Sequence, residues 1–261
     1  MGTNNSSGCS NCILSVVGTG PGSLDYLIPA ARKELEQAEI IVGYKTYLDL
    51  IGEIIEDKEV VYSSMMQEVD RVKQAFTLAE QGKHVALVSG GDPGIYAMAG
   101  LVFEIGATRT IQTEIRVKAG IAALNSCAER LGAPLMHDFA TVSLSDLLTP
   151  WELIEKRIQA AVEADFVLVI YNPKSKKRDW QLARALELVA SKRKQSTPVG
   201  MVRGATRANE EVIITTLKHF EPDCVDMQST VIIGNSATRV AGGRMLTPRG
   251  YHRKYDIKNS D

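Results

Sequence analysis

The feature that most constrains the fold is a short apolar stretch that runs into a glycine-rich turn. Residues 84–88, His-Val-Ala-Leu-Val, are typical of a buried parallel strand. Residues 89–96, Ser-Gly-Gly-Asp-Pro-Gly-Ile-Tyr, follow directly, and residues 97–103 have helical spacing. A strand that enters a glycine-rich turn and then a helix can bring backbone amides against a ligand, or can be a tight turn without one.

The first part of the chain alternates short apolar strands with amphipathic helices. We expect strands at 13–17, 39–42, 60–62, 84–88 and 114–118, and helices at 25–37, 45–55, 66–81 and 95–105. This βαβα order predicts a mostly parallel sheet covered by helices.

The second part has strands that lie closer together in the sequence. We expect strands at 139–143, 166–170, 199–202, 211–215 and 229–233, and helices at 121–131, 151–163 and 179–193. This pattern predicts a mixed sheet. The chain is therefore expected to be an α/β protein with an N-terminal domain at 13–119 and a C-terminal domain at 120–247, flanked by a flexible leader at 1–12 and a tail at 248–261.

Composition excludes several classes of protein. Hydrophobic residues make up 44% of the chain, charged residues 23%, and the net charge is −1. These values are typical of an ordinary globular protein and argue against a nucleic-acid binder. No apolar run approaches the roughly 20 residues that cross a bilayer, and the N-terminus does not resemble a signal peptide. We expect a cytoplasmic protein with no membrane or nucleic-acid partner.

The four cysteines do not form a disulfide framework for a chain of this length. Cys9 and Cys12 form one C-x-x-C pair, which could supply two ligands to a metal site that normally needs about four. Cys127 and Cys224 are not spaced as a second pair. We therefore expect no metal site, and we expect the Cys9–Cys12 pair to lie outside the core of either domain.

A second glycine-rich loop, Gly18-Thr19-Gly20-Pro21-Gly22, follows the first expected strand. It does not match the dinucleotide fingerprint, because Ser23 stands where the third glycine would fall and Pro21 interrupts the loop amides. A nicotinamide enzyme is therefore disfavoured. The sequence also contains no P-loop, H-E-x-x-H or G-x-S-x-G motif.

These two glycine-rich loops together resemble the pair that is typical of the tetrapyrrole methylases, which use S-adenosylmethionine. The resemblance extends from about residue 13 over nearly the whole chain. Four longer blocks, at 131–139, 143–151, 171–175 and 203–207, are similar to the members that methylate C17 of precorrin-3B or cobalt-factor III. The general motifs alone would not separate such an enzyme from C11- or C20-methylating relatives or from a diphthamide-pathway methylase.

The resemblance implies two α/β domains with S-adenosylmethionine in a cleft between them, a homodimer, and a role in cobalamin biosynthesis. The implied reaction is methyl transfer to C17 coupled to ring contraction. The residues that match the family's cofactor-binding positions are Pro21, Gly90, Gly91, Asp92, Ile95, Ala122, Ala123, Asn172, Ala205, Thr230 and Val231. Relatives carry a Thr-Ala or Ser-Ala pair at Ala122-Ala123, so a hydroxyl group is missing here.

A substrate edged with acetate and propionate groups calls for basic side chains, and arginine binds carboxylates in bidentate fashion. Arg203 and Arg207, near the end of an expected strand, are the candidates for substrate binding. The basic run Lys174, Lys176, Lys177 and Arg178 is either a second set or a solvated surface.

Ring contraction needs a proton to move, and His137 with Asp138 is the candidate acid–base pair. The same dipeptide could instead turn or cap the chain. A non-catalytic tetrapyrrole-binding or cofactor-sensing module is the alternative from another class of protein. The sequence does not decide whether cobalt is already in the ring.

Overall fold

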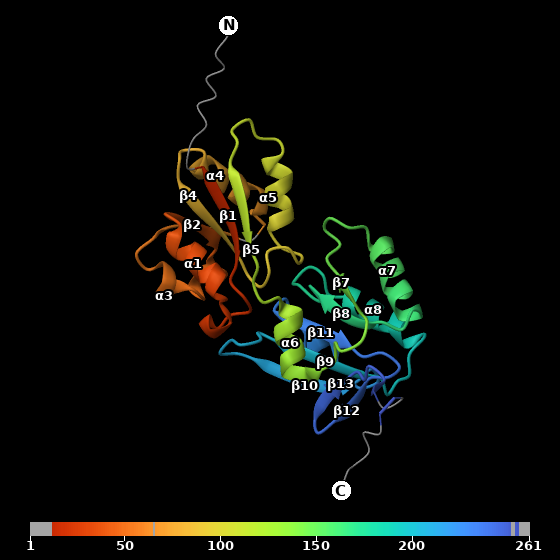
Figure 1. Ribbon diagram of the computed structural model, residues 1–261. Helices are drawn as coiled ribbons and strands as arrows, with labels where there is room; N and C mark the ends of the chain where they lie inside the picture. The colour runs from red at the N-terminus through yellow and green to blue at the C-terminus, as the bar shows by residue number, and fades with distance from the viewer. Residues whose placement is uncertain (1–11, 65, 252–253, 256–261) are drawn as a thin grey trace. The chain divides into compact units, whose positions relative to one another are not determined.

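The computed structural model describes residues 12–64, 66–251 and 254–255 (Figure 1). The chain divides into two compact units between Ala123 and Leu124. The boundary expected from the sequence lies between residues 119 and 120. In the described part of the chain, no helix is long and apolar enough to cross a membrane.

The first unit is built on a parallel sheet with the strand order β3-β2-β4-β1-β5 (Figure 1). Its strands are β1 (Ile13–Gly18), β2 (Ile40–Tyr44), β3 (Glu59–Ser63), β4 (His84–Ser89) and β5 (Glu114–Lys118). Every residue of β4 is buried, which explains its continuous apolar run. The predicted parallel sheet is thus confirmed.

Helices cover both faces of this sheet. They are α1 (Pro29–Gln37), α2 (Lys45–Asp49), α3 (Gly52–Ile55), α4 (Glu68–Ala79) and α5 (Ala99–Gly106), with a 3-10 turn at Leu24–Tyr26. Leu87 packs in the apolar cluster with residues of α4 and α5, whereas Val88 packs in the cluster with residues of α1, α2 and α3. Successive residues of β4 therefore supply two separate cores, as the alternation of side chains along a strand requires.

Two helices begin four residues later than expected. The helix predicted at 25–37 begins at Pro29, because Ser23 caps the 3-10 turn by accepting a hydrogen bond from the Asp25 N–H. The helix predicted at 95–105 begins at Ala99. Tyr96, with φ +51°, adopts a left-handed conformation that is incompatible with a helix, so the glycine-rich turn extends further than the sequence indicates.

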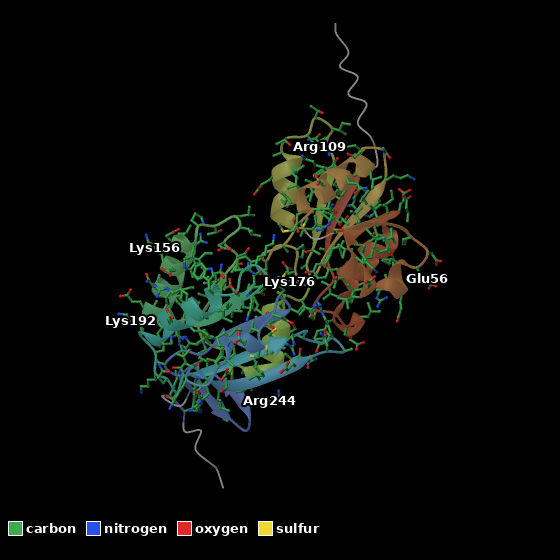
Figure 2. All side chains as sticks on the ribbon, turned by 180° about the vertical axis from the view of Figure 1, so that it is seen from behind. Glu56, Arg109, Lys156, Lys176, Lys192 and Arg244 are labelled. Atoms are coloured by element: carbon green, nitrogen blue, oxygen red, sulfur yellow. The ribbon has the colours of Figure 1, made fainter. Side chains whose placement is uncertain are left out.

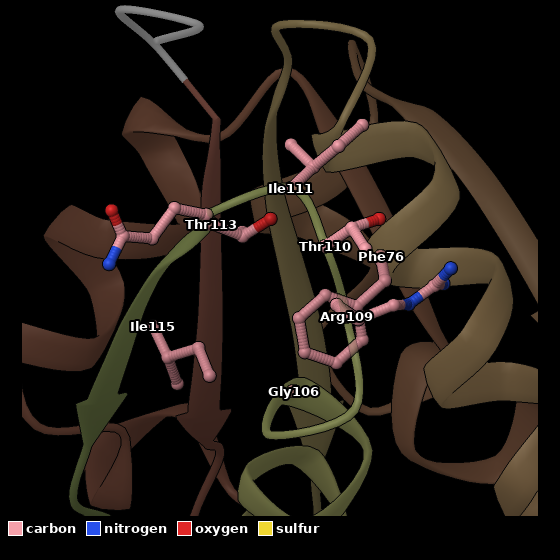
Figure 3. Close-up of a pocket in the computed structure, with 8 residues that line it drawn as sticks. Phe76, Gly106, Arg109, Thr110, Ile111, Thr113 and Ile115 are labelled. Atoms are coloured by element: carbon pink, nitrogen blue, oxygen red, sulfur yellow. The ribbon is translucent and has the colours of Figure 1, made fainter. Parts of the chain in front are cut away.

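A pocket of about 330 Å³ lies between α4, the end of α5 and the start of β5 (Figure 3). Phe76, Arg109 and Ile115 are among the residues that line it. It lies at the amino-terminal end of β5, so it is at the opposite edge of the sheet from the two glycine-rich loops.

The second unit contains a mixed sheet with the strand order β10-β9-β11-β8-β7, as predicted. Its strands are β7 (Phe139–Ser143), β8 (Val167–Tyr171), β9 (Pro198–Arg203), β10 (Glu211–Thr216) and β11 (Ser229–Ile233). Strands β7 and β8 are parallel, and β11 is antiparallel to both β8 and β9. The start of β11 therefore shares one edge of the sheet with the carboxyl ends of β7, β8 and β9.

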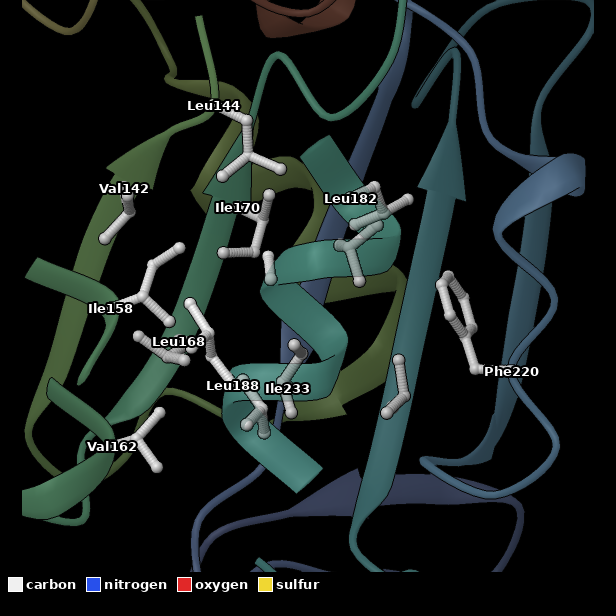
Figure 4. Close-up of a cluster of buried hydrophobic side chains, with 14 of the residues drawn as sticks. Val142, Leu144, Ile158, Val162, Leu168, Ile170, Leu182, Leu188, Phe220 and Ile233 are labelled. Atoms are coloured by element: carbon white, nitrogen blue, oxygen red, sulfur yellow. The ribbon is translucent and has the colours of Figure 1, made fainter. Parts of the chain in front are cut away.

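The main core of the second unit lies where α7 (Trp151–Glu163) and α8 (Gln181–Ala190) pack against this sheet (Figure 4). Ile158 of α7, Leu182 of α8 and Leu168 of β8 are completely or almost completely buried there. The other elements of the unit are α6 (Ala123–Leu131), a 3-10 turn (Pro222–Cys224), and a small sheet of β6 (Gly132–Ala133), β12 (Arg239–Ala241) and β13 (Arg244–Leu246). These short strands were not expected from the sequence.

Charged side chains line the outside of both units (Figure 2). Glu56, Lys156, Lys192 and Arg244 are all exposed. This arrangement agrees with the ordinary globular composition.

Candidate functional site

The two glycine-rich loops are joined by hydrogen bonds to each other. The Gly20 N–H donates to the Gly91 carbonyl oxygen at 3.1 Å, and the Gly91 N–H donates to the Gly20 carbonyl oxygen at 2.8 Å. Strands β4, β1 and β5 are neighbours in the sheet, so both loops lie at one carboxyl edge. Ligands of open α/β sheets bind at this edge.

Three glycines around these loops are required by internal packing. A Cβ atom at Gly18 would lie 2.7 Å from the Gly91 carbonyl oxygen, and one at Gly120 would clash with the same oxygen. A Cβ atom at Gly90 would lie 2.5 Å from the ring of Tyr47. The small size of Gly90 is therefore required by the Tyr47 ring, and its role in cofactor binding stays a prediction.

Gly91 differs from these glycines. Its φ of +66° favours glycine, yet an added Cβ atom would meet no atom closer than 3.8 Å. Its nearest neighbours are the backbone of Ala123, Ala122 and Ile121. Its backbone conformation, rather than close packing, therefore calls for glycine at Gly91, and binding of the cofactor against this backbone stays a prediction.

Asp92 fixes the shape of the turn. Its Oδ1 accepts a hydrogen bond from the Gly94 N–H at 2.8 Å, and its Oδ2 accepts one from the Gly120 N–H at 3.1 Å. The carboxylate thus ties the loop after β4 to the segment after β5. A carboxylate has further lone pairs, so these two bonds leave it able to accept from a ligand.

The structure brings the other candidates of the first unit to the same edge. Pro21 is buried next to Gly20, and Ala122 is buried beside Gly91. Ile95 follows on the same turn, with 36% of its surface exposed. Small and apolar residues therefore gather at this edge of the sheet.

In the second unit, Asn172 lies at the carboxyl end of β8. Its φ is +49°, and its Nδ2 donates to the Ser143 Oγ at 2.9 Å. The bond joins the carboxyl ends of β8 and β7. Ala205 is buried in the loop between β9 and β10, flanked by Gly204 and Thr206, which both have positive φ.

Thr230 and Val231 lie on β11, and both are buried. Val231 belongs to the main apolar core of the second unit. Thr230 is hydrogen-bonded to the thiol of Cys127 on α6. Burial raises the pKa of this thiol to about 11, although its hydrogen bonds with Thr230 and Ser126 act in the opposite direction. Cys127 is therefore a protonated core thiol at neutral pH.

Arg203 is held by partners within the second unit. Its guanidinium pairs with Glu211, the residue opposite it on β10, and lies 3.9 Å from Asp226. Binding of a substrate carboxylate by Arg203 stays a prediction, and it would compete with these pairs. Arg207 lies in the loop after β9, where its N–H donates to the Gly204 carbonyl oxygen at 2.9 Å.

His137 and Asp138 lie just before β7, and the Asp138 carbonyl oxygen accepts from the N–H of Val167 at the start of β8. This is the opposite end of these parallel strands from Ser143 and Asn172. The Nδ1 of His137 accepts from the Asp138 N–H at 2.8 Å, and both side chains are exposed. The length of β7 separates the pair from Asn172, so we expect that His137 does not act on a substrate bound near Asn172; replacement of His137 tests the acid–base role that the sequence suggests.

A buried charged cluster in the first unit was missed by the sequence analysis. The carboxylate of Glu34 on α1 accepts from the Ser15 Oγ at 2.5 Å, lies 3.2 Å from the His84 Nε2, and pairs with the Lys118 Nζ at 3.1 Å. Burial raises the pKa of Glu34, but hydrogen bonds from Ser15 and Lys118 and the nearby positive charges outweigh burial and leave it lowered. The polar Ser15 inside an apolar strand was the available signal.

Cys12 departs from expectation. It is 3% exposed, directly before β1, and its carbonyl oxygen accepts from the Glu114 N–H at 2.8 Å. The expectation that it lies outside the core is wrong, whereas Cys9 lies outside the described residues. Among the described residues, no group of three or more His, Cys, Asp or Glu side chains is placed to hold a metal ion.

Comparisons with known proteins identify the family. Residues 14–221 match the sequence profile of the Tetrapyrrole (Corrin/Porphyrin) Methylases. This chain belongs to that family, and it is a methyltransferase of the α/β fold class.

The names of individual relatives point to a more specific activity than the family does. The chain is 50% identical over 239 residues to a probable cobalt-factor III C(17)-methyltransferase of Salmonella typhimurium, covering 92% of this chain and 99% of the relative. It is 46% identical to the cobalt-factor III methyltransferase of Priestia megaterium over 95% of its own length, but spans only 47% of that longer protein. It is 42% identical to the precorrin-3B C(17)-methyltransferase of a Sinorhizobium species, covering 91% of this chain and 96% of the relative.

Solved structures of methyltransferases have the same fold as this chain. The methyltransferase CobJ superposes with a TM-score of 0.86 at 36% identity, covering 90% of this chain and 99% of that one. A cobalt precorrin-4 methyltransferase, CbiF, superposes with a TM-score of 0.69 at 21% identity, covering 87% of this chain and 96% of that one, and so shows a shared fold.

Proposed function

We propose that this chain transfers the methyl group of S-adenosylmethionine to C17 of a cobalamin-pathway tetrapyrrole, coupled to contraction of the ring. The observation that carries the proposal is the match along nearly the whole length of both this chain and the Salmonella typhimurium relative. Cobalt-factor III is the first candidate substrate, because that relative is more similar than the one named for precorrin-3B.

The residues at the carboxyl edge of the first unit fit such a cofactor. A Cβ atom added at Gly91 would make only ordinary van der Waals contacts, Ala122 and Ala123 are small, and Asp92 offers a carboxylate that two backbone N–H groups already hold. Because these hydrogen bonds fix the turn, little ordering is left to accompany binding.

The cofactor supplies a methyl group that is already activated by its positively charged sulfur. The protein therefore needs to position the acceptor carbon in line with that methyl group and to exclude water, and alignment of this kind can supply about 7–11 kcal/mol. We propose that the edge containing Pro21, Gly91 and Ile95 binds the donor. In the second unit, we propose that the loops containing Asn172 and Ala205 also contact it.

A turnover assay tests this proposal. The purified chain is incubated with S-adenosylmethionine and either cobalt-factor III or precorrin-3B, and the absorption spectrum and mass of the product are recorded. The expected result is a singly methylated, ring-contracted product, formed faster from cobalt-factor III. Binding of S-adenosylhomocysteine without turnover of either macrocycle would instead favour a cofactor-sensing module or a methylase with another substrate.

We also propose that the chain works as a cytoplasmic homodimer. Light scattering with size-exclusion chromatography would give twice the mass of one 28.5 kDa chain. A mass of one chain would contradict the proposal.

A further inference from the structure

The loop after β8 carries four basic residues, and the structure separates them. Lys174 pairs with Asp223, with 2.9 Å between Nζ and Oδ1. Lys176, labelled in Figure 2, and Lys177 are exposed. Arg178 is 8% exposed, so it is the buried member of this run.

A tight turn holds Arg178 in place. The Ser175 N–H donates to the Arg178 carbonyl oxygen at 2.8 Å, and the Arg178 N–H donates to the Ser175 carbonyl oxygen at 3.2 Å. The backbone of Arg178 is therefore fixed at the carboxyl edge of the sheet, a few residues after Asn172.

The side chain of Arg178 is buried with one of its donors unsatisfied. Its Nε has no hydrogen-bond partner, and among the described side chains no carboxylate forms an ion pair with it. Burial lowers the pKa of Arg178, and the negative charge of Asp146 opposes this shift from a longer range. A buried cation that no carboxylate contacts directly is unfavourable, so such a group is normally completed by a directly paired anion.

A second polar atom nearby is also unsatisfied. The Nε2 of Gln181 donates to the Asp146 Oδ2 at 2.9 Å, whereas its Oε1 has no partner. This bond ties the loop after β7 to the start of α8. A water molecule could satisfy the Gln181 oxygen, but it could not neutralise the charge of Arg178.

The side chains beside these polar groups are apolar and exposed. Leu147 and Leu148, directly after Asp146, are 70% and 98% exposed. Trp180, directly before Gln181, is 49% exposed and packs edge-on against Trp151, with ring centroids 4.8 Å apart. Exposed apolar side chains in the same loops as a buried cation suit a flat apolar molecule that is edged with carboxylates.

We propose that Arg178 binds a side-chain carboxylate of the tetrapyrrole substrate. The planar guanidinium matches a carboxylate in bidentate geometry, which would supply a directly paired counter-charge in addition to the more distant Asp146. This inference rests on the proposed function, and it assigns the role to Arg178 rather than to the paired Arg203.

Tryptophan fluorescence gives a direct test. The two tryptophans of the chain, Trp151 and Trp180, lie in contact beside this site, so a bound, strongly absorbing macrocycle should quench them. Cobalt-factor III is titrated into wild type, Arg178→Met, Arg178→Lys and the exposed neighbour Lys177→Met. A parallel titration uses the same macrocycle with its carboxylates converted to amides, and calorimetry measures the Kd for S-adenosylhomocysteine.

We expect Arg178→Met to raise the Kd for the carboxylate macrocycle at least tenfold. Arg178→Lys, which keeps the charge but loses the planar fork, should show a smaller loss. Lys177→Met should bind as wild type. The amide macrocycle should bind weakly to wild type and Arg178→Met alike, and the Tm of Arg178→Met should not fall, because an unpaired buried charge has been removed.

Three results would overturn the proposal. Unchanged macrocycle binding by Arg178→Met would remove the role altogether. Loss of S-adenosylhomocysteine affinity instead would assign Arg178 to the carboxylate of the cofactor. A lower Tm with parallel loss of both ligands would show a structural role. Because binding is measured directly, the test stands apart from turnover: a wild type that binds the macrocycle through Arg178 without methylating it would contradict only the proposed function.

Discussion

At the scale of single residues, the glycine-rich loops show that one residue type serves two purposes. Gly18, Gly90 and Gly120 are small because backbone or an aromatic ring lies against them. Gly91 needs its left-handed conformation, but an added Cβ atom there would make only ordinary van der Waals contacts with the backbone of its neighbours. Of these four positions, Gly91 is the one where close packing does not require glycine, and binding of the cofactor there stays a prediction.

Replacement of Gly91 by alanine tests this distinction. We expect Gly91→Ala to weaken S-adenosylhomocysteine binding at least tenfold in calorimetry. Stability should fall by about 1–2 kcal/mol, because an L-residue is strained at this positive φ.

Gly100→Ala is the matched control. Gly100 lies in α5 with no neighbouring atom within 4 Å, so alanine there should raise helix stability by up to about 1 kcal/mol and leave binding unchanged. Wild-type affinity in Gly91→Ala would contradict the assignment.

For His137, in contrast to Gly91, we predict that replacement has little effect. Its exposed ring lies before β7, at the far end of the strand from Ser143. We expect His137→Ala to change kcat less than about twofold, because a general acid or base normally contributes on the order of a hundredfold or more. The measurement is the initial rate at saturating concentrations of both substrates. A hundredfold loss at unchanged Tm would instead show that His137 is a catalytic residue, as the sequence analysis expects.

At the scale of elements, the Glu34 cluster ties α1 to three strands of the first sheet. Ser15 lies on β1, His84 on β4, and Lys118 at the end of β5. The folded state lowers the pKa of Glu34 below 4.5. A lowered pKa means that the ionised Glu34 carboxylate stabilises the folded state. This contribution to the free energy of unfolding is complete above about pH 4.5 and is lost as the pH falls through the lower pKa of the folded state.

Thermal unfolding between pH 7 and pH 3 tests this dependence. We expect Glu34→Gln to lower stability at pH 7 by about 2 kcal/mol, since it removes charged hydrogen bonds from a buried group. The difference from wild type should shrink as the pH falls below 4.5, because the wild-type carboxylate then becomes protonated. Glu36→Gln, an exposed neighbour on α1, should show neither effect. A difference that is independent of pH would contradict the account.

The elements themselves could largely be predicted from the sequence, because apolar periodicity reports burial. The helix at 151–163 and the strands at 114–118, 139–143 and 229–233 have the bounds expected for them. The two-residue β6 could not be found, since its pairing with β13 is a tertiary contact. The late start of α5 depends on the left-handed Tyr96, which no local propensity reveals.

The candidate site could be predicted less completely. The sequence identified the loops, but it could not tell that Tyr47 occupies the space beside Gly90 or that Glu211 pairs with Arg203. Both facts depend on residues brought together by folding. The sequence likewise could not separate the buried Arg178 from its exposed neighbours, because a run of basic residues carries no periodic signal of burial.

At the scale of the whole molecule, the family is established by a match over residues 14–221, and the two units each have the expected α/β architecture. The position that is methylated on the macrocycle is a finer property than the fold, because more distant structural relatives with the same fold, such as CbiF, act on other substrates according to their names. Regiochemistry is therefore the property on which the proposed function depends most.

The measurement that tests this most directly uses S-adenosylmethionine labelled with ¹³C in its methyl group. After turnover of cobalt-factor III, carbon NMR locates the label on the product. The account predicts one enriched methyl carbon, attached to C17 of a contracted ring. Enrichment at C11 or C20, or an unmethylated macrocycle recovered from an enzyme that binds S-adenosylhomocysteine, would contradict it.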